Sequence, residues 1–333
     1  MAFYSNAPLP DTNARQGATT VRPSSSAILA IDSEDRYKDY VDQNNRPTSP
    51  YDFTISKPQN LLAGFFTRLG VTEVVFPWAI PNVNAKTNIM LYTYQIGAAP
   101  PVTNVLLLEA IGFYKPAELA ARIQSDISNI VGVPFTFRYG GGGASTIGNN
   151  IALPFFQYNI GAGNTILFTP MTPFSAQYPY GPNTKQLFNL LGFTSQNSQP
   201  FQLGAGEFTF CQAVKYIDIV CNQLTNNQAV KDAMSQSVVR DTLCRIYIAD
   251  NTGTNQSTIS PADPLFCPIG CAPTTLYRNF TMPKMIQWTP NQNIPGYLRF
   301  EIYDDGGDSL ATSIGQPVFG TMDWQMTMLV SEN

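Results

Sequence analysis

The chain has 333 residues, of which 44% are hydrophobic and 13% charged, and its formal net charge is −4. This length suffices for one large or two moderate domains, and the charged fraction lies well below the roughly 25% usual for soluble domains. The sequence has no clustered run of Lys and Arg, so nothing in it indicates a surface for nucleic acid. The absence of His removes Ser-His-Asp and Cys-His catalysis together with the commonest zinc sites.

The low charge, with 26 Pro and 24 Gly, favours a protein that covers much of its surface with partners. The first residues lack the basic and apolar regions of a signal peptide, and no window reaches the ~18 apolar residues of a membrane span. We therefore expect a chain made and used in reducing cytosol, with no membrane span. Its five Cys, an odd number, argue against a disulfide framework.

Residues 1–25 are polar and punctuated by Pro and Ser, so we expect an extended arm without a core of its own. The arm is either a disordered tail or a segment that docks on a neighbouring subunit. After it, period-two patterns predict strands at 28–33, 53–55 and 65–76. Pro77 and Pro81 are expected to end the third strand, because proline cannot donate to a ladder. One face of that strand is predicted to carry Leu69, Val71, Glu73 and Val75.

From about residue 82 the pattern changes to mixed helices and strands. Pro116 suits a helix start, and Leu119, Ile123, Ile127 and Ile130 recur at helical spacing, so the pattern predicts a helix over Lys115–Val131. A second, short helical piece is expected at 184–193. Strands are predicted at 88–96, 104–111, 134–139, 151–160 and 165–169. We interpret residues 86–207 as an inserted small α+β domain.

Two alternating runs, Val214–Cys221 and Thr242–Ala249, predict strands half buried against a core. The polar connection between them is too long for a hairpin turn, so we expect the second strand to belong to a facing sheet. Further strands are predicted at 278–288, 297–303 and 318–330. With the early strands this makes about eight, the number of a jelly roll. The predicted fold is therefore an all-β-dominated jelly-roll β-sandwich, formed by 26–85 plus 208–333, with the inserted domain at 86–207.

Four segments carry a further signal through their order along the chain. They are IDSEDR (Ile31–Arg36) with YDFTI (Tyr51–Ile55), GFYKPAELAARIQSDISN (Gly112–Asn129), LFNLLGF (Leu187–Phe193), and KYIDIVCNQL (Lys215–Leu224) with Lys284–Gly307. In this order they resemble the single jelly-roll minor capsid and penton proteins of large eukaryotic DNA viruses and virophages. The individual motifs are loose, none is catalytic, and the N-terminal FYSNAPLPDTNARQG matches no pattern of that family.

The resemblance implies a non-enzymatic virion component that is assembled in the host cytoplasm and packs against the major capsid protein and other capsid proteins. It also implies a homo-oligomer, which is a pentamer if the chain is a penton. An internal cement protein stays open, although the long insertion favours the penton. Rival hypotheses are a β-sandwich carbohydrate-binding or receptor-attachment module and an enzyme of the glycoside hydrolase or lyase class.

The polar motifs are expected to be structural. Gly140–Gly143 lacks the Lys-Ser/Thr of a P-loop and predicts a connection between strands. Asp304, Asp305 and Asp308 match no EF-hand spacing and predict a turn. Asp32, Glu34 and Asp35 predict a solvated strand end or an Asp32–Arg36 salt bridge.

Cysteines and aromatic residues also have structural interpretations. Cys267 and Cys271 give only two thiolates of the four ligands that zinc needs, and Cys211, Cys221 and Cys244 are expected to be buried core thiols. Asn255 and Asn279 fit a glycosylation pattern, here expected to be coincidental. The aromatic segments Phe155–Tyr158 and Phe174–Gly181 are either core and contact residues or a sugar-stacking platform. We predict no catalytic, cofactor-binding or metal-binding residue, and no cofactor.

Overall fold

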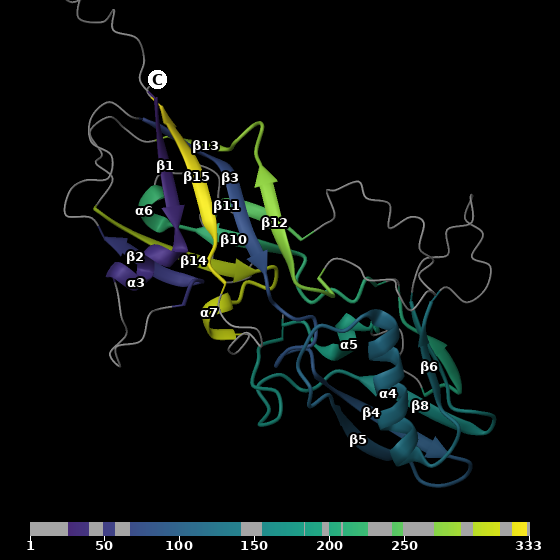
Figure 1. The fold of residues 1–333 in the computed structure, drawn as a ribbon. Helices are drawn as coiled ribbons and strands as arrows, with labels where there is room; N and C mark the ends of the chain where they lie inside the picture. The colour runs from purple at the N-terminus through teal and green to yellow at the C-terminus, as the bar shows by residue number, and fades with distance from the viewer. Residues whose placement is uncertain are drawn as a thin grey trace, which may run out of the picture.

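The computed structural model describes residues 26–39, 49–56, 67–140, 155–182, 184–194, 200–207, 209–225, 242–248, 270–287, 296–313 and 322–331. Strands dominate these residues. They form two larger antiparallel sheets and two three-stranded sheets, and the smaller sheets lie apart from the larger ones (Figure 1).

The two larger sheets form a β-sandwich. Sheet 1 has the order β1 (Ser26–Asp32), β15 (Gln325–Ser331), β3 (Arg68–Trp78) and β12 (Thr274–Asn279), and β13 (Met285–Gln287) also pairs with β3. Sheet 2 has the order β11 (Thr242–Tyr247), β10 (Tyr216–Val220), β14 (Tyr297–Asp304) and β2 (Asp52–Ser56). Short helical turns flank these strands: η1 (Ser33–Asp35), α3 (Arg36–Asp39), α6 (Asn222–Thr225) and α7 (Leu310–Ser313).

The pairing of the sandwich strands is nested. The first strand pairs with the last (β1 with β15), the second with the seventh (β2 with β14), the third with the sixth (β3 with β12), and the fourth with the fifth (β10 with β11). A long antiparallel hairpin that is wound up in this way is a jelly roll. The predicted fold class is therefore confirmed, with β12 and β13 sharing one strand position on β3.

Aromatic side chains from both sheets fill the core of the sandwich. Trp324, next to β15, lies 5.7 Å from Phe53 of β2, 6.0 Å from Phe300 of β14 and 6.3 Å from Phe76 of β3, measured between ring centroids. Its indole N–H donates to the carbonyl oxygen of Pro50 at 2.7 Å, so its polar atom is satisfied although the ring is buried.

The face assignment predicted for β3 is wrong beyond Val71, because the strand contains a β-bulge. Thr327 of β15 pairs with Glu73 and the next residue, Met328, pairs with Val71, so Thr72 is the extra residue. Leu69 and Val71 face the core before the bulge, and Val74, Phe76 and Trp78 face it afterwards. One unpaired residue shifts the two-residue period and moves the other set of side chains inward. The strand also continues through Pro77, where β15 no longer pairs with it.

The prediction that residues 242–249 belong to a facing sheet is also wrong. β11 pairs directly with β10 in sheet 2, with Ile217 opposite Ile246. β10 is buried along its whole length, including Asp218, whose carboxylate accepts two hydrogen bonds from Arg245 at 2.7 and 2.8 Å. That charge-assisted pair lets a strand with an acidic residue lie in the interior. The connection at 226–241, with Asn226 and Gln228, lies outside the described residues.

Two other predicted strands differ in extent. The strand predicted at 278–288 is two strands, β12 and β13, separated by Phe280–Lys284, which contains Pro283. The strand predicted at 318–330 begins at Gln325, and residues 314–321 lie outside the described part.

The residues between β3 and β10, 79–215, are called the insertion below. One of its sheets has the order β5 (Val102–Leu107), β4 (Ile89–Ile96) and β8 (Asn164–Thr169), and the other β6 (Thr136–Tyr139), β7 (Phe156–Asn159) and β9 (Leu203–Ala205). The helices are α4 (Pro116–Val131) and α5 (Leu187–Leu190), and α4 packs against β6 and β5 (Figure 1). β9 was not predicted from the sequence.

The predicted helix over 115–131 is confirmed as α4. Glu118 accepts a hydrogen bond from the backbone N–H of Lys115 at 3.2 Å, and Gly132 ends the helix in the left-handed conformation (φ 68°). Leu119, Ile123 and Ile127 are buried as the spacing indicates, whereas Ile130 is 49% exposed. One contiguous hydrophobic cluster contains buried residues of both the insertion and the sandwich, and a second, small cluster in the insertion contains Ile89, Met171 and Tyr178.

We predict that Ile217→Ala lowers the free energy of unfolding by about 2–5 kcal/mol, because the buried side chain leaves a cavity between β11 and β14. Ile130→Ala is the matched control, since this exposed side chain of α4 should change stability by less than about 0.5 kcal/mol. Urea unfolding followed by circular dichroism measures both. Equal effects of the two substitutions would contradict the assignment of β10 to the core.

Candidate functional site

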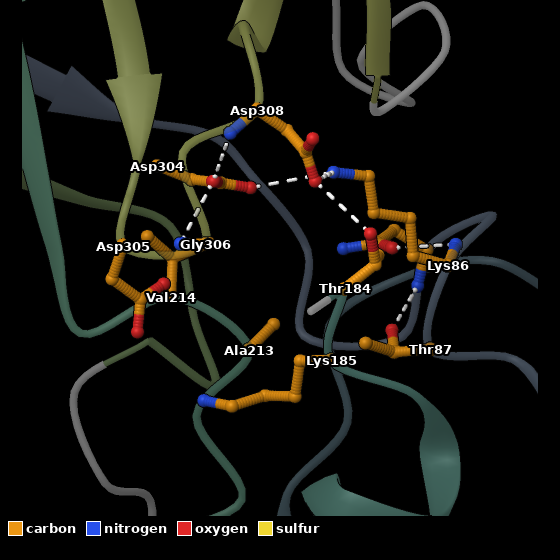
Figure 2. Close-up of a pocket in the computed structure, with 11 residues that line it drawn as sticks. Lys86, Thr87, Thr184, Lys185, Ala213, Val214, Asp304, Asp305, Gly306 and Asp308 are labelled. Carbon is orange, nitrogen blue, oxygen red and sulfur yellow. Dashed lines mark hydrogen bonds and ion pairs between the residues drawn. The ribbon is translucent and has the colours of Figure 1, made fainter. Parts of the chain in front are cut away.

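A polar cluster lies where the insertion meets the sandwich. β3 in sheet 1 leads into the insertion, and the chain returns through β10 in sheet 2. The cluster lines a cavity of about 110 Å³ (Figure 2). Its lining residues come from the insertion and from the turn after β14: Asn84, Lys86, Thr87, Thr184, Lys185, Ala213, Val214, Asp304, Asp305, Gly306 and Asp308.

Lys86 is the residue of this cluster that pairs with its carboxylates. A compact turn positions it, because the side-chain oxygen of Asn84 accepts the backbone N–H of Lys86 at 2.9 Å. The ammonium Nζ lies 2.8 Å from Asp308 Oδ2 and 3.3 Å from Asp304 Oδ2, and the residue is 4% exposed. Removing an ammonium group from water is costly, and here two carboxylates offset that cost.

The turn that follows β14 holds the Asp304 carboxylate in its orientation. Its Oδ1 accepts the backbone N–H groups of Gly306 at 3.0 Å and Asp308 at 2.8 Å, which leaves Oδ2 for Lys86. Burial raises the pKa of the Asp304 carboxyl, and the Lys86 charge opposes that shift. The turn predicted around Asp304, Asp305 and Asp308 is confirmed, with Gly307 at φ 89° donating to the Asp304 carbonyl.

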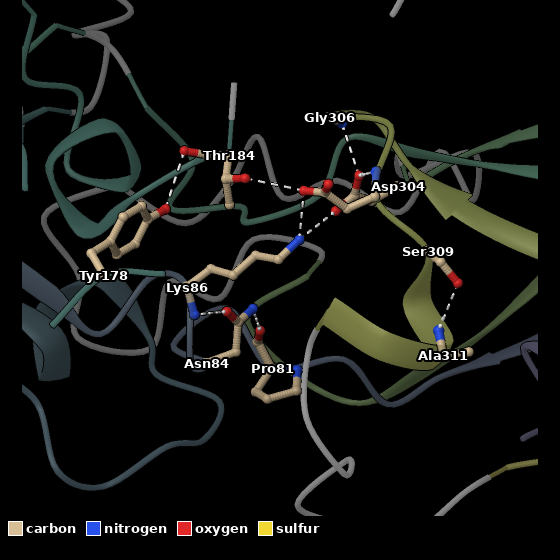
Figure 3. A network of polar contacts seen from close by, with 10 residues as sticks. Pro81, Asn84, Lys86, Tyr178, Thr184, Asp304, Gly306, Ser309 and Ala311 are labelled. Carbon is tan, nitrogen blue, oxygen red and sulfur yellow. Dashed lines mark hydrogen bonds and ion pairs between the residues drawn. The ribbon is translucent and has the colours of Figure 1, made fainter. Parts of the chain in front are cut away.

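A second set of hydrogen bonds connects the insertion to the same turn (Figure 3). The Thr184 hydroxyl donates to Asp308 Oδ2 at 3.1 Å, and the buried Tyr178 hydroxyl donates to the Thr184 carbonyl at 3.3 Å. Next to Thr184, Lys185 Nζ donates to the carbonyl of Gln212 at 2.9 Å. Gln212 in turn donates to the carbonyl of Ile248, just after β11, at 2.6 Å. The insertion is therefore held on both sides of the cavity.

Asn82 organises the crossing point of the chain beneath this cluster. Its side-chain amide donates to the carbonyls of Tyr114 at 2.9 Å and Cys211 at 3.1 Å, and its oxygen accepts the N–H of Tyr114 at 2.9 Å. Asn82 is fully buried, so these bonds replace water. One side chain thus joins the exit from β3, the approach to α4 and the return toward β10.

The outer face of sheet 1 is the second candidate site, an interaction surface. Strand register places its outward residues in rows: Ser26, Ser331, Arg68 and Gln287; Ile28, Leu329, Gly70 and Met285; Ala30, Thr327, Glu73 and Asn279; and Asp32, Gln325, Val75 and Tyr277. Among the outward positions of these rows, only Arg68, Glu73 and Asp32 are charged. The second row is apolar across four strands, with Ile28 74% exposed.

Gly70 lies in the middle of that apolar row for a steric reason. A side-chain carbon there would meet Met285 Sδ at 2.5 Å and Pro283 at 3.1 Å. Met285 and Pro283 therefore fold over the glycine, and Met282, at the tip of the same turn, is 92% exposed. The short helices pack on strands of sheet 2 instead: α3 on β2, α6 on β11 and β14, and α7 on β14.

The acidic motif after β1 has a structural role. Asp32 caps the turn η1 by accepting the N–H of Glu34 at 2.9 Å and also accepts a hydrogen bond from Gln325. The buried Arg36 forms an ion pair with Asp323. The alternative expectation of an Asp32–Arg36 salt bridge is therefore replaced by this pair. Arg36 also donates to the carbonyl of Ser33 at 2.6 Å.

The first aromatic segment is core, which excludes it as a sugar-stacking platform. Phe156 and Tyr158 are buried; Phe156 stacks on Phe137 at 5.5 Å, and Tyr158 packs edge-on against Phe168 at 5.1 Å. In the second segment Tyr178 is buried, whereas Phe174 is 75% exposed. Phe156 and Tyr158 of the first segment therefore belong to the core of the insertion.

The cysteines, the two asparagines of the glycosylation pattern and the glycine run remain to be placed. Cys211, Cys221 and Cys244 are buried thiols, as expected. Asn279 ends β12, while Asn255, Cys267 and residues 141–143 lie outside the described part. No group of three or more metal-ligating side chains occurs among the described residues. No described helix is both long and apolar enough to cross a membrane.

Sequence reasoning missed Lys86, Asn82 and Thr184. Lys86 and Asp304 are 218 positions apart, and no local pattern links them. The one feature of the sequence that could have drawn attention to Lys86 is that it is a lone Lys in the otherwise uncharged stretch NVNAKTNIM.

We predict that Lys86→Met lowers the free energy of unfolding at pH 7 by about 3–5 kcal/mol, because it leaves Asp304 buried without its counter-charge. The folded-state pKa of Asp304 is raised, so its stabilising contribution is present below the unfolded pKa and is lost as pH rises through the folded pKa. The deficit of Lys86→Met should therefore shrink as pH falls toward 4.

The control is Arg122→Met, which removes an exposed pair with Asp126 on α4 and should change stability by less than about 0.5 kcal/mol at either pH. Urea titrations at pH 7 and pH 4 give the four values. A pH-independent deficit for Lys86→Met would contradict the electrostatic role of Lys86.

Comparison with known proteins gives a limited result. No family model matches the chain, and no curated protein matches it. Among solved structures, the chain is similar to the mavirus penton protein, with 9% sequence identity and a TM-score of 0.46 over 94% of this chain and 100% of that chain.

Proposed function

We propose that the chain is a non-enzymatic structural protein of a virion that packs against the major capsid protein. The observation that carries the proposal is the outer face of sheet 1, where an apolar row crosses four strands and charges are few. Jelly rolls serve in viral capsids and also in lectins, so the fold alone does not decide between these functions. The exposed, charge-poor face of sheet 1 supports packing against another protein.

The size of this face indicates what kind of partner occupies it. β1 and β15 have 7 residues each and β3 has 11, while β12 with 6 and β13 with 3 share one strand position. With strands about 4.8 Å apart and a rise of about 3.3 Å per residue, the face covers on the order of 500 Å². A stable pair of free proteins buries about 800 Å² per partner, so this contact is too small to hold two free copies together. It suffices inside a shell, where many simultaneous contacts hold each subunit. The occupant is therefore a lattice-forming capsid protein.

Within the virion, we place the chain at the vertex as a penton, with five copies around the axis. Residues 86–207 are then a second domain that projects outward, and residues 1–25 form an arm at the subunit boundary. The rigid junction around Lys86 and Asn82 supports this arrangement, because a projecting domain must keep a fixed orientation in each copy. An internal cement protein needs no such projection.

Several described residues that the rival functions would use have structural roles. Phe156 and Tyr158 are buried, so they offer no platform to a sugar ring. The acidic residues at the junction, Asp304 and Asp308, are neutralised by Lys86 and serve the turn. Phe156 and Tyr158 cannot meet a sugar without leaving the core of the insertion, and Asp304 is buried in its contact with Lys86.

We predict that Ile28→Lys folds normally and yet lowers incorporation of the chain into particles at least tenfold, because it puts a charge at the most exposed side chain of the apolar row, on the edge strand β1. The matched control is Ile130→Lys on α4, which lies on the insertion and should incorporate like the natural chain. Particles assembled from co-expressed capsid proteins are purified, and the amount of each variant is measured by quantitative mass spectrometry. Equal incorporation of both variants would contradict the proposed packing face, and saturable binding to a glycan array would favour the attachment module.

A further inference from the structure

Two buried cysteines meet where the insertion returns to the sandwich. Cys211 lies just ahead of β10, and Cys271 lies just ahead of β12, 60 positions later. Their segments run in close contact, because a side-chain carbon on Gly270 would lie only 3.0 Å from Cγ of Gln212. No local sequence pattern pairs these two cysteines with each other.

The sulfur atoms share one enclosed space. The amide nitrogen of Asn82 lies 3.8 Å from Cys211 Sγ and 3.4 Å from Cys271 Sγ. Cys271 Sγ lies 3.5 Å from the carbonyl oxygen of Cys211, and both cysteines are at most 2% exposed. Both thiols therefore contact the same side chain from adjacent segments, and Cys271 forms a side-chain hydrogen bond with Cys211.

We propose that Cys211 and Cys271 are a modification site at which a disulfide bond forms and locks the insertion to the sandwich. The bond needs an oxidant, which is a low-molecular-weight disulfide such as oxidised glutathione. One thiolate attacks the reagent, forms a mixed disulfide and releases one glutathione thiolate. The second cysteine then attacks the protein sulfur of the mixed disulfide, the Sγ–Sγ bond forms, and a second glutathione leaves. The two thiol protons pass to the two glutathiones, and two electrons reduce the reagent.

The surroundings of the pair determine when this reaction occurs. The hydrogen bond with Cys211, followed by burial, raises the pKa of Cys271, and the thiolate is the reactive form. The bond therefore forms while the chain folds or when the junction opens locally, and the closed junction then protects it from reduction. It would close a loop that contains β10 and β11, both strands of sheet 2. One disulfide pair is compatible with an odd number of cysteines.

The test refolds the full chain from denaturant in a buffer of reduced and oxidised glutathione. Peptide mapping by mass spectrometry without reduction should find a Cys211–Cys271 linked peptide. The oxidised chain should unfold roughly 5–10 °C above the reduced chain, because the cross-link restricts the unfolded state.

The variants compare each chain with itself, so a change in basal stability does not matter. Cys271→Ala should lose the linked peptide and the difference between oxidised and reduced chains, and Cys211→Ala is the second variant if the first folds poorly. Cys244→Ala, which removes a buried thiol of β11, should keep both. Fully reduced thiols after refolding, or a link from Cys267 to either cysteine instead, would overturn the proposal.

Discussion

The burial of the Lys86 ammonium group is the constraint on which the arrangement of the two halves depends. A lone charge at this depth is strongly unfavourable. Among the described residues, the carboxylates of Asp304 and Asp308, from the turn after β14, compensate it, together with the Tyr180 ring at 5.8 Å. The insertion supplies the cation and the sandwich supplies the anions. Separating the halves by even a few ångströms would leave uncompensated charges on both sides. The ion pairs therefore fix an orientation that apolar packing alone would leave adjustable.

The topology makes such a lock necessary. β3 belongs to sheet 1 and β10 to sheet 2, so the insertion leaves one layer of the jelly roll and returns to the other. Asn82 bridges these paths, and the segment from Tyr178 to Lys185 anchors the far side of the cavity. Because the hydrophobic cluster is continuous across the junction, the insertion behaves as part of the same body. A fixed junction on a charge-poor sandwich supports the proposed structural role.

Local patterns predicted the elements that depend on local chemistry. Helical spacing after Pro116 located α4, and the alternation at 297–303 located β14. The errors arose where tertiary context decides. Thr72 is an ordinary strand residue whose role as a bulge depends on how β15 pairs with β3. The sheet to which β11 belongs cannot follow from the length of its connection, and Lys86 finds its carboxylates only after the jelly roll has closed. The aromatic residues at 155–158 have the same pattern whether they are buried or exposed, so burial settled their role.

We propose that this chain is a structural part of a capsid, built as a jelly roll with an insertion in fixed orientation. The most direct test is a cryo-electron microscopy reconstruction of intact purified particles at a resolution that shows side chains. The account predicts density for this jelly roll around the fivefold vertices, with the outer face of sheet 1 against the major capsid protein and the insertion directed outward. Particles that lack the chain while it remains free in the infected cell would contradict the account.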